Sequence, residues 1–313
     1  MLPDGSGLSQ VPPNVPVMST ANARPEVHLL VTDLDNTLWD WFTIWYESFR
    51  ALLDGVSRTS GIPTATLEAE IRQVHQRRGT SEYSYLLQEL PSLRRLHPNG
   101  DVLDVYGEDI HAYRSARKRN TQLYPGVLGA LTAIRAAGVP VVGYTESLSF
   151  HSSRRIRDLG LDGVIDVLYS SPDHDFPDGV SPEDLRSEPP ESYDLRETVH
   201  RYVPRGHLKP DPMILSSIMA MMDVEPQRTV YVGDSLMKDV AMAQAVGAID
   251  VLAAYGAADH QDGYELLRRV SHWTEEDVRR EQEINAAPPL SPSYILKQRF
   301  DELLGFFNFH GRP

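Results

Sequence analysis

Short runs of apolar, largely β-branched residues recur along the chain. They lie at residues 27–32, 139–144, 164–169, 229–232 and 249–252. A near-continuous apolar run of this length is typical of a strand that is buried on both faces, as in a parallel sheet. The pattern therefore predicts a sheet in which these five segments are parallel strands.

Helical patterns fill the intervals between these runs. Apolar residues recur at helical spacing in residues 127–137, 149–159, 213–222 and 239–246. Three of these segments end at a glycine, and the third begins after Asp211-Pro212, a favourable N-cap and first-turn pair. The alternation of strands and helices predicts an α/β fold with a doubly wound, Rossmann-like parallel sheet.

Two segments interrupt this alternation. Residues 45–120 show no strong strand signal but several helical patterns, at Trp45–Leu53, Thr66–His75 and Ser84–Leu90. We predict an all-helical domain here, inserted into a core domain formed by residues 26–44 and 121–256. The second interruption, residues 172–206, is rich in acids and prolines over residues 172–200. It is predicted to be a mobile acidic loop and no part of the core.

The two ends of the chain differ from the core in composition. Residues 1–25 are rich in Pro, Gly and Ser without periodicity, which predicts a flexible tail, and Met18 is an alternative start of translation. Residues 257–313 form a partly helical extension with a Pro-rich break at 288–292. Its large apolar residues are expected to dock on the core, with a dimer contact as the alternative; they are Phe300, Leu303, Leu304, Phe306 and Phe307.

Composition narrows the class of protein. The chain has no Cys, which excludes disulfides, thiolate metal sites and a cysteine nucleophile, and favours a reducing cytoplasm. A formal charge of −14 disfavours binding to nucleic acid or to an anionic membrane. No apolar run approaches the roughly 20 residues of a membrane span. We expect a cytoplasmic enzyme or small-ligand binder, as a monomer or homodimer.

The strongest chemical signal follows the first predicted strand directly. It is the run Asp33-Leu34-Asp35-Asn36-Thr37. Alternate residues of an extended chain point the same way, so the carboxylates of Asp33 and Asp35 are expected to converge on one site. Two such carboxylates favour either a bound divalent cation or one protonated partner. The alternative interpretation is that they cap a turn or the start of a helix.

A second acidic strand end repeats this arrangement. An apolar strand leads through Gly233 to Asp234, and Asp239 follows five residues later. Carboxylates from two strand ends are enough to hold Mg²⁺, which prefers oxygen ligands. A turn with an N-cap is the simpler alternative.

Two further residues suit a phosphate group. Thr145 ends the second strand and opens a helix, where its hydroxyl and nearby N–H groups could bind an oxyanion. Lys209 stands shortly before a helix and the fourth strand. Taken singly, Thr145 is equally explained as a helix cap and Lys209 as a solvated lysine.

Together these segments resemble the four motifs of the haloacid dehalogenase (HAD) superfamily, in the same order, over about residues 28–247. They are the run from Asp33 to Thr37, then Thr145, then Lys209, then Gly233-Asp234-Ser235-Leu236-Met237-Lys238-Asp239. The resemblance implies a core domain with a helical cap over the site, close to the phosphoglycolate phosphatase and phosphomutase branch.

The resemblance also implies roles for these residues. Asp33 would be the nucleophile that forms an aspartyl-phosphate, and Asp35 the general acid and base. Thr145 and Lys209 would bind the phosphoryl oxygens. Mg²⁺ would be held by the Asp33 carboxylate, the Asp35 backbone carbonyl and Asp234, with Asp239 acting through a bound water.

The second acid of the first motif separates the chemistries of this superfamily. Dehalogenases lack it, so Asp35 favours hydrolysis of a phosphate ester, and we expect a Mg²⁺-dependent phosphatase acting on a small phosphorylated metabolite. Two alternatives remain: a phosphomutase that acts on a sugar phosphate with the same residues, and a non-catalytic binding module of the same fold.

The helical insertion offers candidates for substrate selection. His75, Arg77 and Arg78 belong to a segment that resembles the cap loop facing the nucleophile, and are expected either to contact substrate or to be ordinary residues at a helix end. Trp39, Trp41, Phe42 and Trp45 are predicted to pack in the core and hinge, with a leaving-group pocket as the alternative. The run Arg154-Arg155-Ile156-Arg157 is predicted to be a solvated helix face.

Overall fold

The computed structural model describes residues 24–173, 193–257, 263–274, 279 and 290–311. Its centre is a sheet of seven parallel strands in the order β5-β4-β3-β2-β6-β7-β8. These are β2 (Leu29–Thr32), β3 (Val141–Leu148), β4 (Val167–Ser171), β5 (Val199–Tyr202), β6 (Thr229–Gly233), β7 (Ile249–Ala253) and β8 (Tyr294–Leu296). The five strands predicted from apolar runs are present, and the parallel α/β prediction is confirmed.

The central strand shows why its sequence is a continuous apolar run. In β2, Leu30 pairs with Val141 on one side and with Val230 on the other. Leu30 packs into one hydrophobic cluster, whereas Leu29 and Val31 pack into another on the opposite face. Because each face is covered, a polar side chain in this strand needs a hydrogen-bond partner within the protein, as the buried Thr32 hydroxyl has in the Asp33 carbonyl at 2.7 Å.

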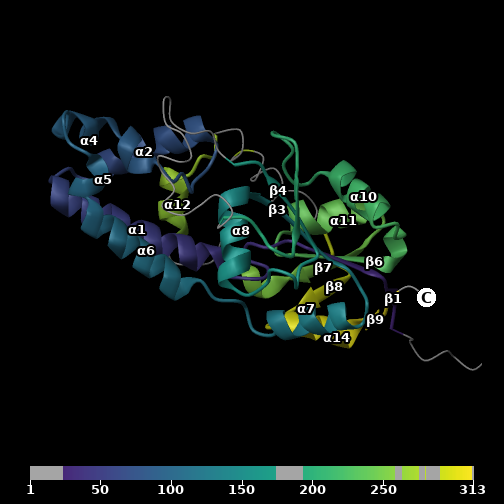
Figure 1. Cartoon of the computed structure of the whole chain (residues 1–313). Helices are drawn as coiled ribbons and strands as arrows, with labels where there is room; N and C mark the ends of the chain where they lie inside the picture. The colour runs from purple at the N-terminus through teal and green to yellow at the C-terminus, as the bar shows by residue number, and fades with distance from the viewer. Residues whose placement is uncertain (1–23, 174–192, 258–262, 275–278, 280–289, 312–313) are drawn as a thin grey trace, which may run out of the picture.

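Helices cover both faces of the sheet, as a doubly wound fold requires. They are α7 (Val127–Ala136), α8 (Ser149–Asp158), α10 (Pro212–Met221), the π-helix η3 (Leu236–Val240) and α11 (Ala241–Ala245), with short 3-10 turns η2 (Pro226–Arg228) and η4 (Ala254–Gly256). Figure 1 shows α7 on one side of the sheet and α10 and α11 on the other. Ile134 of α7 and Ile218 of α10 accordingly belong to different clusters.

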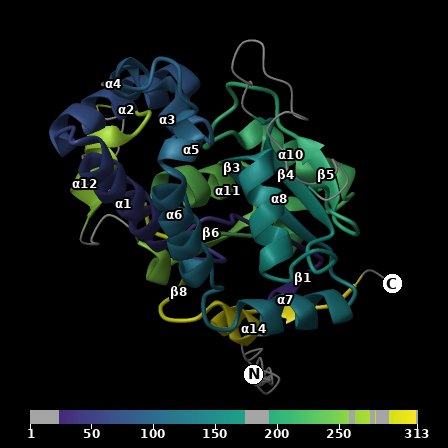
Figure 2. The same cartoon turned by 60° about the vertical axis from the view of Figure 1, so that its left-hand side comes forward.

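A helical domain is inserted after β2. Its helices are α1 (Trp41–Ser60), α2 (Thr64–Arg78), α3 (Leu86–Glu89), α4 (Pro91–Leu96), α5 (Val102–Val105) and α6 (Gly107–Asn120). The Asp40 side chain caps α1 by accepting a hydrogen bond from the Thr43 N–H. Phe42 and Trp45 lie in the core of this domain, so the prediction that they pack is confirmed. The helical insert stands beside the sheet in Figures 1 and 2.

The C-terminal extension divides between the two domains. Helix α12 (Tyr264–Val270) packs against α2 and contributes Leu266, Leu267 and Val270 to the core of the helical domain. In Figure 2 it lies among helices from the first third of the chain. This segment of the predicted, partly helical extension is therefore a helix that packs in the core of the helical domain.

The last described residues return to the sheet domain. Strand β8 extends the sheet beside β7, followed by η5 (Phe300–Glu302), α14 (Leu303–Phe306) and β9 (Asn308–Phe309), which pairs with β1 (Glu26–Val27). Phe300, Leu303 and Phe307 are buried in the sheet-domain core, and Leu304 and Phe306 pack against it. The predicted docking of these apolar residues is confirmed.

The acidic insertion ends in an element that the sequence did not reveal. Residues 174–192 lie outside the described residues, as do 1–23 of the predicted tail. Residues 199–202 form the edge strand β5, so the prediction of a loop without core structure was wrong there. The strand lacks an apolar run because it is exposed at the sheet edge, where Val199 is 50% and Tyr202 62% exposed. Among the described helices, none is long and apolar enough to cross a membrane.

Candidate active site

The carboxyl ends of three neighbouring strands bring the predicted residues to one edge of the sheet. Asp33 follows β2, and its backbone N–H donates to the carbonyl of Val232 on β6 at 2.8 Å. One oxygen of its buried carboxylate accepts from Lys209 Nζ at 2.5 Å, and the other accepts from the Thr37 hydroxyl at 3.1 Å. These two contacts fix the orientation of the carboxylate.

Lys209 joins the first and last motifs. Its Nζ lies 3.0 Å from Asp239 Oδ1 as well as beside Asp33, and its side chain is only 2% exposed. The ammonium also lies over the rings of Tyr144 and Tyr231, at 4.9 and 5.6 Å from their centroids. Burial lowers the pKa of Lys209, but Asp239 and Asp33 outweigh it and raise the pKa well above its usual value. Lys209 is therefore a fixed positive charge.

Asp239 is held by the strand that leads to it. Its Oδ1 accepts from the Tyr231 hydroxyl at 3.0 Å, and its Oδ2 accepts from the Ser235 N–H at 3.1 Å. A Cβ added to Gly233 would lie 2.2 Å from Asp239 Cγ. Only glycine at position 233 leaves room for this carboxylate, which gives a steric reason for the Gly-Asp pair at the end of β6.

Three carboxylates gather at this edge. The side-chain oxygens of Asp33, Asp234 and Asp239 lie within 4.8 Å of one another. Lys209 offsets one of the three negative charges, which leaves two. Asp234 has no ion-pair partner among the described residues. A divalent cation fits both the excess charge and the oxygen donor set, so these residues can hold Mg²⁺.

The pKa values of this cluster report the same excess charge. Burial, with the help of Asp239 and Asp35 and against the effect of Lys209, raises the pKa of Asp33 to about 7. Burial and the neighbouring Asp33 and Asp239 raise the pKa of Asp234 well above its usual range. Without a cation, the raised pKa values of Asp33 and Asp234 disfavour their charged forms. A bound cation would stabilise these carboxylates in the charged form.

The second motif is tied to the third and fourth through Glu146. Thr145 is buried in the second half of β3, and its hydroxyl accepts from the Ser147 N–H at 3.0 Å. Glu146 accepts from the Lys209 N–H at 2.9 Å and from Lys238 Nζ at 2.5 Å. The β2–β3 register pairs Thr32 with Gly143, so the segments carrying Asp33 and Thr145 leave the sheet at the same edge.

Asp35 turns away from the carboxylate cluster. Its Oδ1 accepts from Trp39 Nε1 at 2.6 Å and faces Arg155 Nη1 at 3.4 Å, and its Oδ2 accepts from the Ser147 hydroxyl at 2.5 Å. Trp39 is buried, and packing of this tryptophan was predicted. The structure thus separates the roles of the two acids: Asp33 belongs to the cluster and Asp35 faces the helix that follows β3.

Arg155 corrects the prediction of a solvated helix face. Its side chain is 6% exposed and pairs with Asp35 of the core and with Glu82 of the helical domain. The reason is local: α8 begins directly after β3, so the side of its first turns that carries Arg155 lies against the site.

Glu82 is the cap residue that reaches the core. Besides Arg155, its carboxylate accepts from Trp41 Nε1 at 2.9 Å, and its backbone carbonyl lies 2.7 Å from His151 Nε2. Burial raises its pKa, but Arg155 and the other donors outweigh this and lower the pKa to about 2.

The sequence analysis missed Glu82, Arg155 and Ser147. One signal was available for the core side of this contact: His151 and Arg155 are four residues apart, which places them on one face of the helix that follows the second motif.

The three cap residues proposed from the sequence have other surroundings. His75 is buried in the core of the helical domain, with Nδ1 2.6 Å from the Val270 carbonyl. Burial lowers its pKa to about 4. Arg77 and Arg78 both pair with Glu89, Arg77 at 2.8 Å. None of these three contacts joins the helical domain to the Asp33 cluster.

The family comparison agrees with this geometry. A model of the haloacid dehalogenase-like hydrolases matches residues 27–247, which include the sheet from β2 to α11, the helical insert and the carboxylate cluster. The protein therefore belongs to the haloacid dehalogenase-like hydrolase family. A search of curated proteins gave no significant match.

Similar solved structures include a 2-haloacid dehalogenase from Pseudomonas syringae pv. Tomato DC3000, 17% identical, with a TM-score of 0.48 and coverage of 90% of this chain and 97% of that one. A predicted phosphoglycolate phosphatase from Haemophilus somnus 129PT is 15% identical, with a TM-score of 0.46 and coverage of 89% and 97%. A HAD phosphatase from Thermococcus onnurineus is 17% identical, with a TM-score of 0.45 and coverage of 90% and 99%.

Proposed function

We propose that this protein is a Mg²⁺-dependent phosphatase that hydrolyses a small phosphomonoester through an aspartyl-phosphate on Asp33. The observation that carries the proposal is the setting of the Asp33 carboxylate. It lies between Lys209 and Thr37 and beside a buried cluster with two uncompensated negative charges. Phosphoryl transfer needs little from a protein beyond such positioning and charge neutralisation.

The first half-reaction uses both acids of the first motif. A carboxylate oxygen of Asp33 attacks phosphorus and forms the acyl-phosphate bond, while the bond from phosphorus to the ester oxygen breaks. Asp35, in its protonated form, gives a proton to that leaving oxygen, and the alcohol departs. Lys209 and the Thr145 hydroxyl bind the phosphoryl oxygens during transfer.

The second half-reaction releases phosphate and restores the acids. Asp35 now accepts a proton from water, and the water oxygen attacks phosphorus. The acyl-phosphate bond breaks, inorganic phosphate leaves, and Asp33 is a carboxylate again. Mg²⁺ held by Asp33, Asp234 and Asp239 would neutralise charge on the phosphoryl group.

The position of Asp35 supports ester hydrolysis over dehalogenation. A halide leaves without a proton, so dehalogenation has no use for an acid at this point, whereas an alkoxide leaving group requires one. Ser147, Trp39 and Arg155 hold Asp35 next to the carboxylate cluster, and Asp35 is not a member of that cluster. This is a suitable place from which to serve the leaving group.

The helical domain is proposed to close over the site and to exclude water from the acyl-phosphate. The contact of Glu82 with Arg155 supports this role, because it links the cap to the residue that faces Asp35.

The experiment is an assay of phosphate release from para-nitrophenyl phosphate and from a panel of metabolite phosphates, with and without Mg²⁺, for the wild type and Asp33→Asn. We expect Mg²⁺-dependent release that the variant lacks while its circular dichroism is unchanged. Activity retained in Asp33→Asn, or a well-folded wild type that cleaves no ester of the panel, would refute the proposal. Transfer of the phosphoryl group to a second position of a sugar phosphate would identify a phosphomutase instead.

A further inference from the structure

The first and last strands of the described chain lie side by side. Strand β1 pairs in parallel with β9, so that Glu26 is opposite Asn308 and Val27 is opposite Phe309. Val27 is fully buried and Phe309 packs against the sheet-domain core. Because side chains alternate along a strand, Glu26 and His28 share the other face of this ribbon, and His310, two residues after Asn308, lies on the same face.

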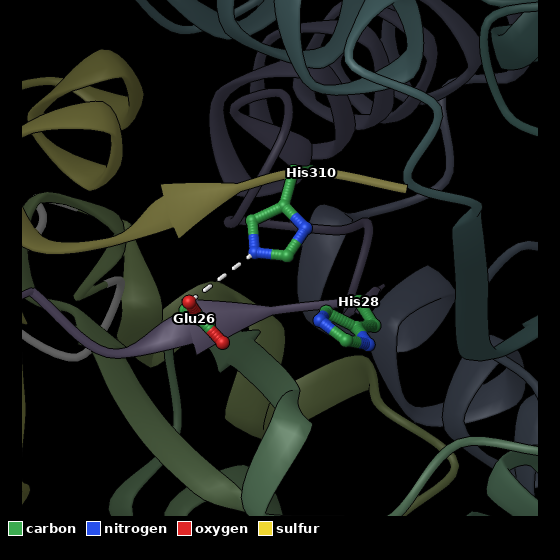
Figure 3. A group of neighbouring side chains, drawn as sticks. All are labelled: Glu26, His28 and His310. Carbon is green, nitrogen blue, oxygen red and sulfur yellow. Dashed lines mark ion pairs between the residues drawn. The ribbon is translucent and has the colours of Figure 1, made fainter. Parts of the chain in front are cut away.

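The side chains on this face form a compact set of donors. Glu26, His28 and His310 each offer one ligand atom, and these atoms lie within 4.8 Å of one another. Figure 3 shows the His310 ring extending from its strand toward the neighbouring strand, which carries Glu26 and His28. His310 Nε2 lies 3.7 Å from Glu26 Oε1, and the centroids of the two rings are 4.9 Å apart.

The surroundings orient two of these donors, His310 and Glu26, toward each other. His310 Nδ1 lies 3.2 Å from the Gly311 carbonyl oxygen, a contact that requires the proton on Nδ1 and leaves the lone pair on Nε2, which faces Glu26. Glu26 Oε2 accepts from Arg228 Nη1 at 2.8 Å, which leaves Oε1 for His310. Metal-binding histidines and carboxylates usually have outer partners of these two kinds.

We propose that Glu26, His28 and His310 bind one divalent transition-metal ion of the zinc class. Two imidazoles and a carboxylate are a favourable donor set for Zn²⁺, Ni²⁺ or Cu²⁺ and a poor one for Mg²⁺. Ligand atoms of a tetrahedral zinc ion lie roughly 3.3 Å apart, given bonds of about 2 Å. The 3.7 Å between His310 and Glu26 needs only a small adjustment to reach this spacing.

Such an ion would join the two ends of the described chain. Glu26 and His28 stand before the first strand of the sheet, and His310 follows the last element that docks on it. The ion would therefore stabilise the docked C-terminal segment and would be separate from the all-carboxylate site, which suits a hard cation. With three protein ligands, a tetrahedral ion would have a fourth coordination position for water.

The test is calorimetric titration of the full-length, untagged protein with ZnCl₂ in the presence of millimolar MgCl₂, which occupies the carboxylate cluster. We expect one Zn²⁺ per chain, with affinity at least about tenfold weaker in His310→Ala and in His28→Ala. His111→Ala, which removes an exposed histidine of α6, is the matched control and should bind as the wild type does. Equal zinc affinity in all four proteins, or no binding at micromolar Zn²⁺ in the wild type, would overturn the proposal.

A second measurement does not depend on the folding of a variant. Co²⁺ added to the wild type should give the visible absorption of a four-coordinate ion with nitrogen ligands, and Zn²⁺ should abolish it by displacement. A Co²⁺ spectrum indistinguishable from that of the hydrated ion would also overturn the proposal, whatever the phosphatase assay shows.

Discussion

Arg155 of the sheet domain and Glu82 of the helical domain form a buried ion pair, and the same guanidinium faces Asp35. This contact connects the cap to the acid that we assign to the leaving group. Because both side chains are removed from water, neither charge is well solvated without its partner. We therefore expect the pair to couple the position of the helical domain to the state of the active site.

Replacing either partner alone should be costly. We expect Arg155→Met to lower the free energy of unfolding by about 3 kcal/mol, because it leaves the buried Glu82 carboxylate without its cation. Glu82→Gln should cost less, because Arg155 keeps its longer contact with Asp35. The kcat for a phosphate ester should fall as well. The measurement is a double-mutant cycle by chemical denaturation and steady-state kinetics. Because the residues are in contact, the double variant should lose less than the two single variants together. Strictly additive losses in both quantities would show that the pair is not coupled.

The glycine before Asp234 gives a steric prediction. Gly233→Ala should displace Asp239, since the new Cβ would lie 2.2 Å from its Cγ. We expect a large loss of activity and a higher Mg²⁺ concentration for half-maximal activity, measured by magnesium titration of the steady-state rate.

Gly129→Ala is the control for that experiment. Nothing lies within 4 Å of a Cβ at this exposed position in α7, so the substitution should leave activity unchanged and stabilise the helix by about 0.5–1 kcal/mol. A Gly233→Ala enzyme with wild-type magnesium dependence would mean that Asp239 does not need its observed position.

His75 predicts a dependence of stability on pH. Burial lowers its pKa from 6.5 to about 4, and its Nε2 is buried without a hydrogen-bond partner. Between pH 6.5 and about 4, His75 is therefore protonated in the unfolded chain and neutral in the folded chain. The contribution of neutral His75 to the free energy of unfolding is complete above pH 6.5. It is lost as the pH falls toward about 4, and the loss is about 3 kcal/mol at most.

The measurement is chemical denaturation at several pH values for the wild type and for His75→Asn, whose amide can still donate to the Val270 carbonyl. The wild type should lose more stability than the variant as the solution is acidified from pH 6.5. Identical curves in that range would assign the acid sensitivity to other groups.

The sequence was most informative where a single strand or helix determines the environment of its own residues. Strands buried on both faces require apolar residues, so five of the seven strands of the sheet were predictable. The edge strands β5 and β8 were not. Strand β5 is mostly exposed and has no apolar run, and β8, although apolar, has only three residues. Likewise Asp33 and Asp234 directly follow strands, and Thr145 lies two residues beyond the last residue of β3 that pairs with β2. Parallel strands bring residues at such positions together.

The contact between Arg155 and Glu82 could not be predicted from the pattern of a single element. Arg155 belongs to a basic run that looks solvated, and its burial depends on Glu82 and Asp35, which are distant in the sequence. The surroundings of His75 depend on Val270, a residue of α12 that no local pattern assigns to the helical domain. Environments of this kind follow from tertiary packing, and single-sequence periodicity contains no information about it.

The central claim is that Asp33 carries the phosphoryl group, and the most direct measurement is to trap it there. Asp35→Asn should retain attack by Asp33 on acetyl phosphate, whose leaving group needs no proton, but should activate water poorly in the second half-reaction. With Mg²⁺ present, we predict that intact-protein mass spectrometry finds one added phosphoryl group and that peptide mapping places it on Asp33. Hydrolysis of acetyl phosphate by this variant with no phosphoenzyme, or a phosphoryl group on another residue, would contradict the account.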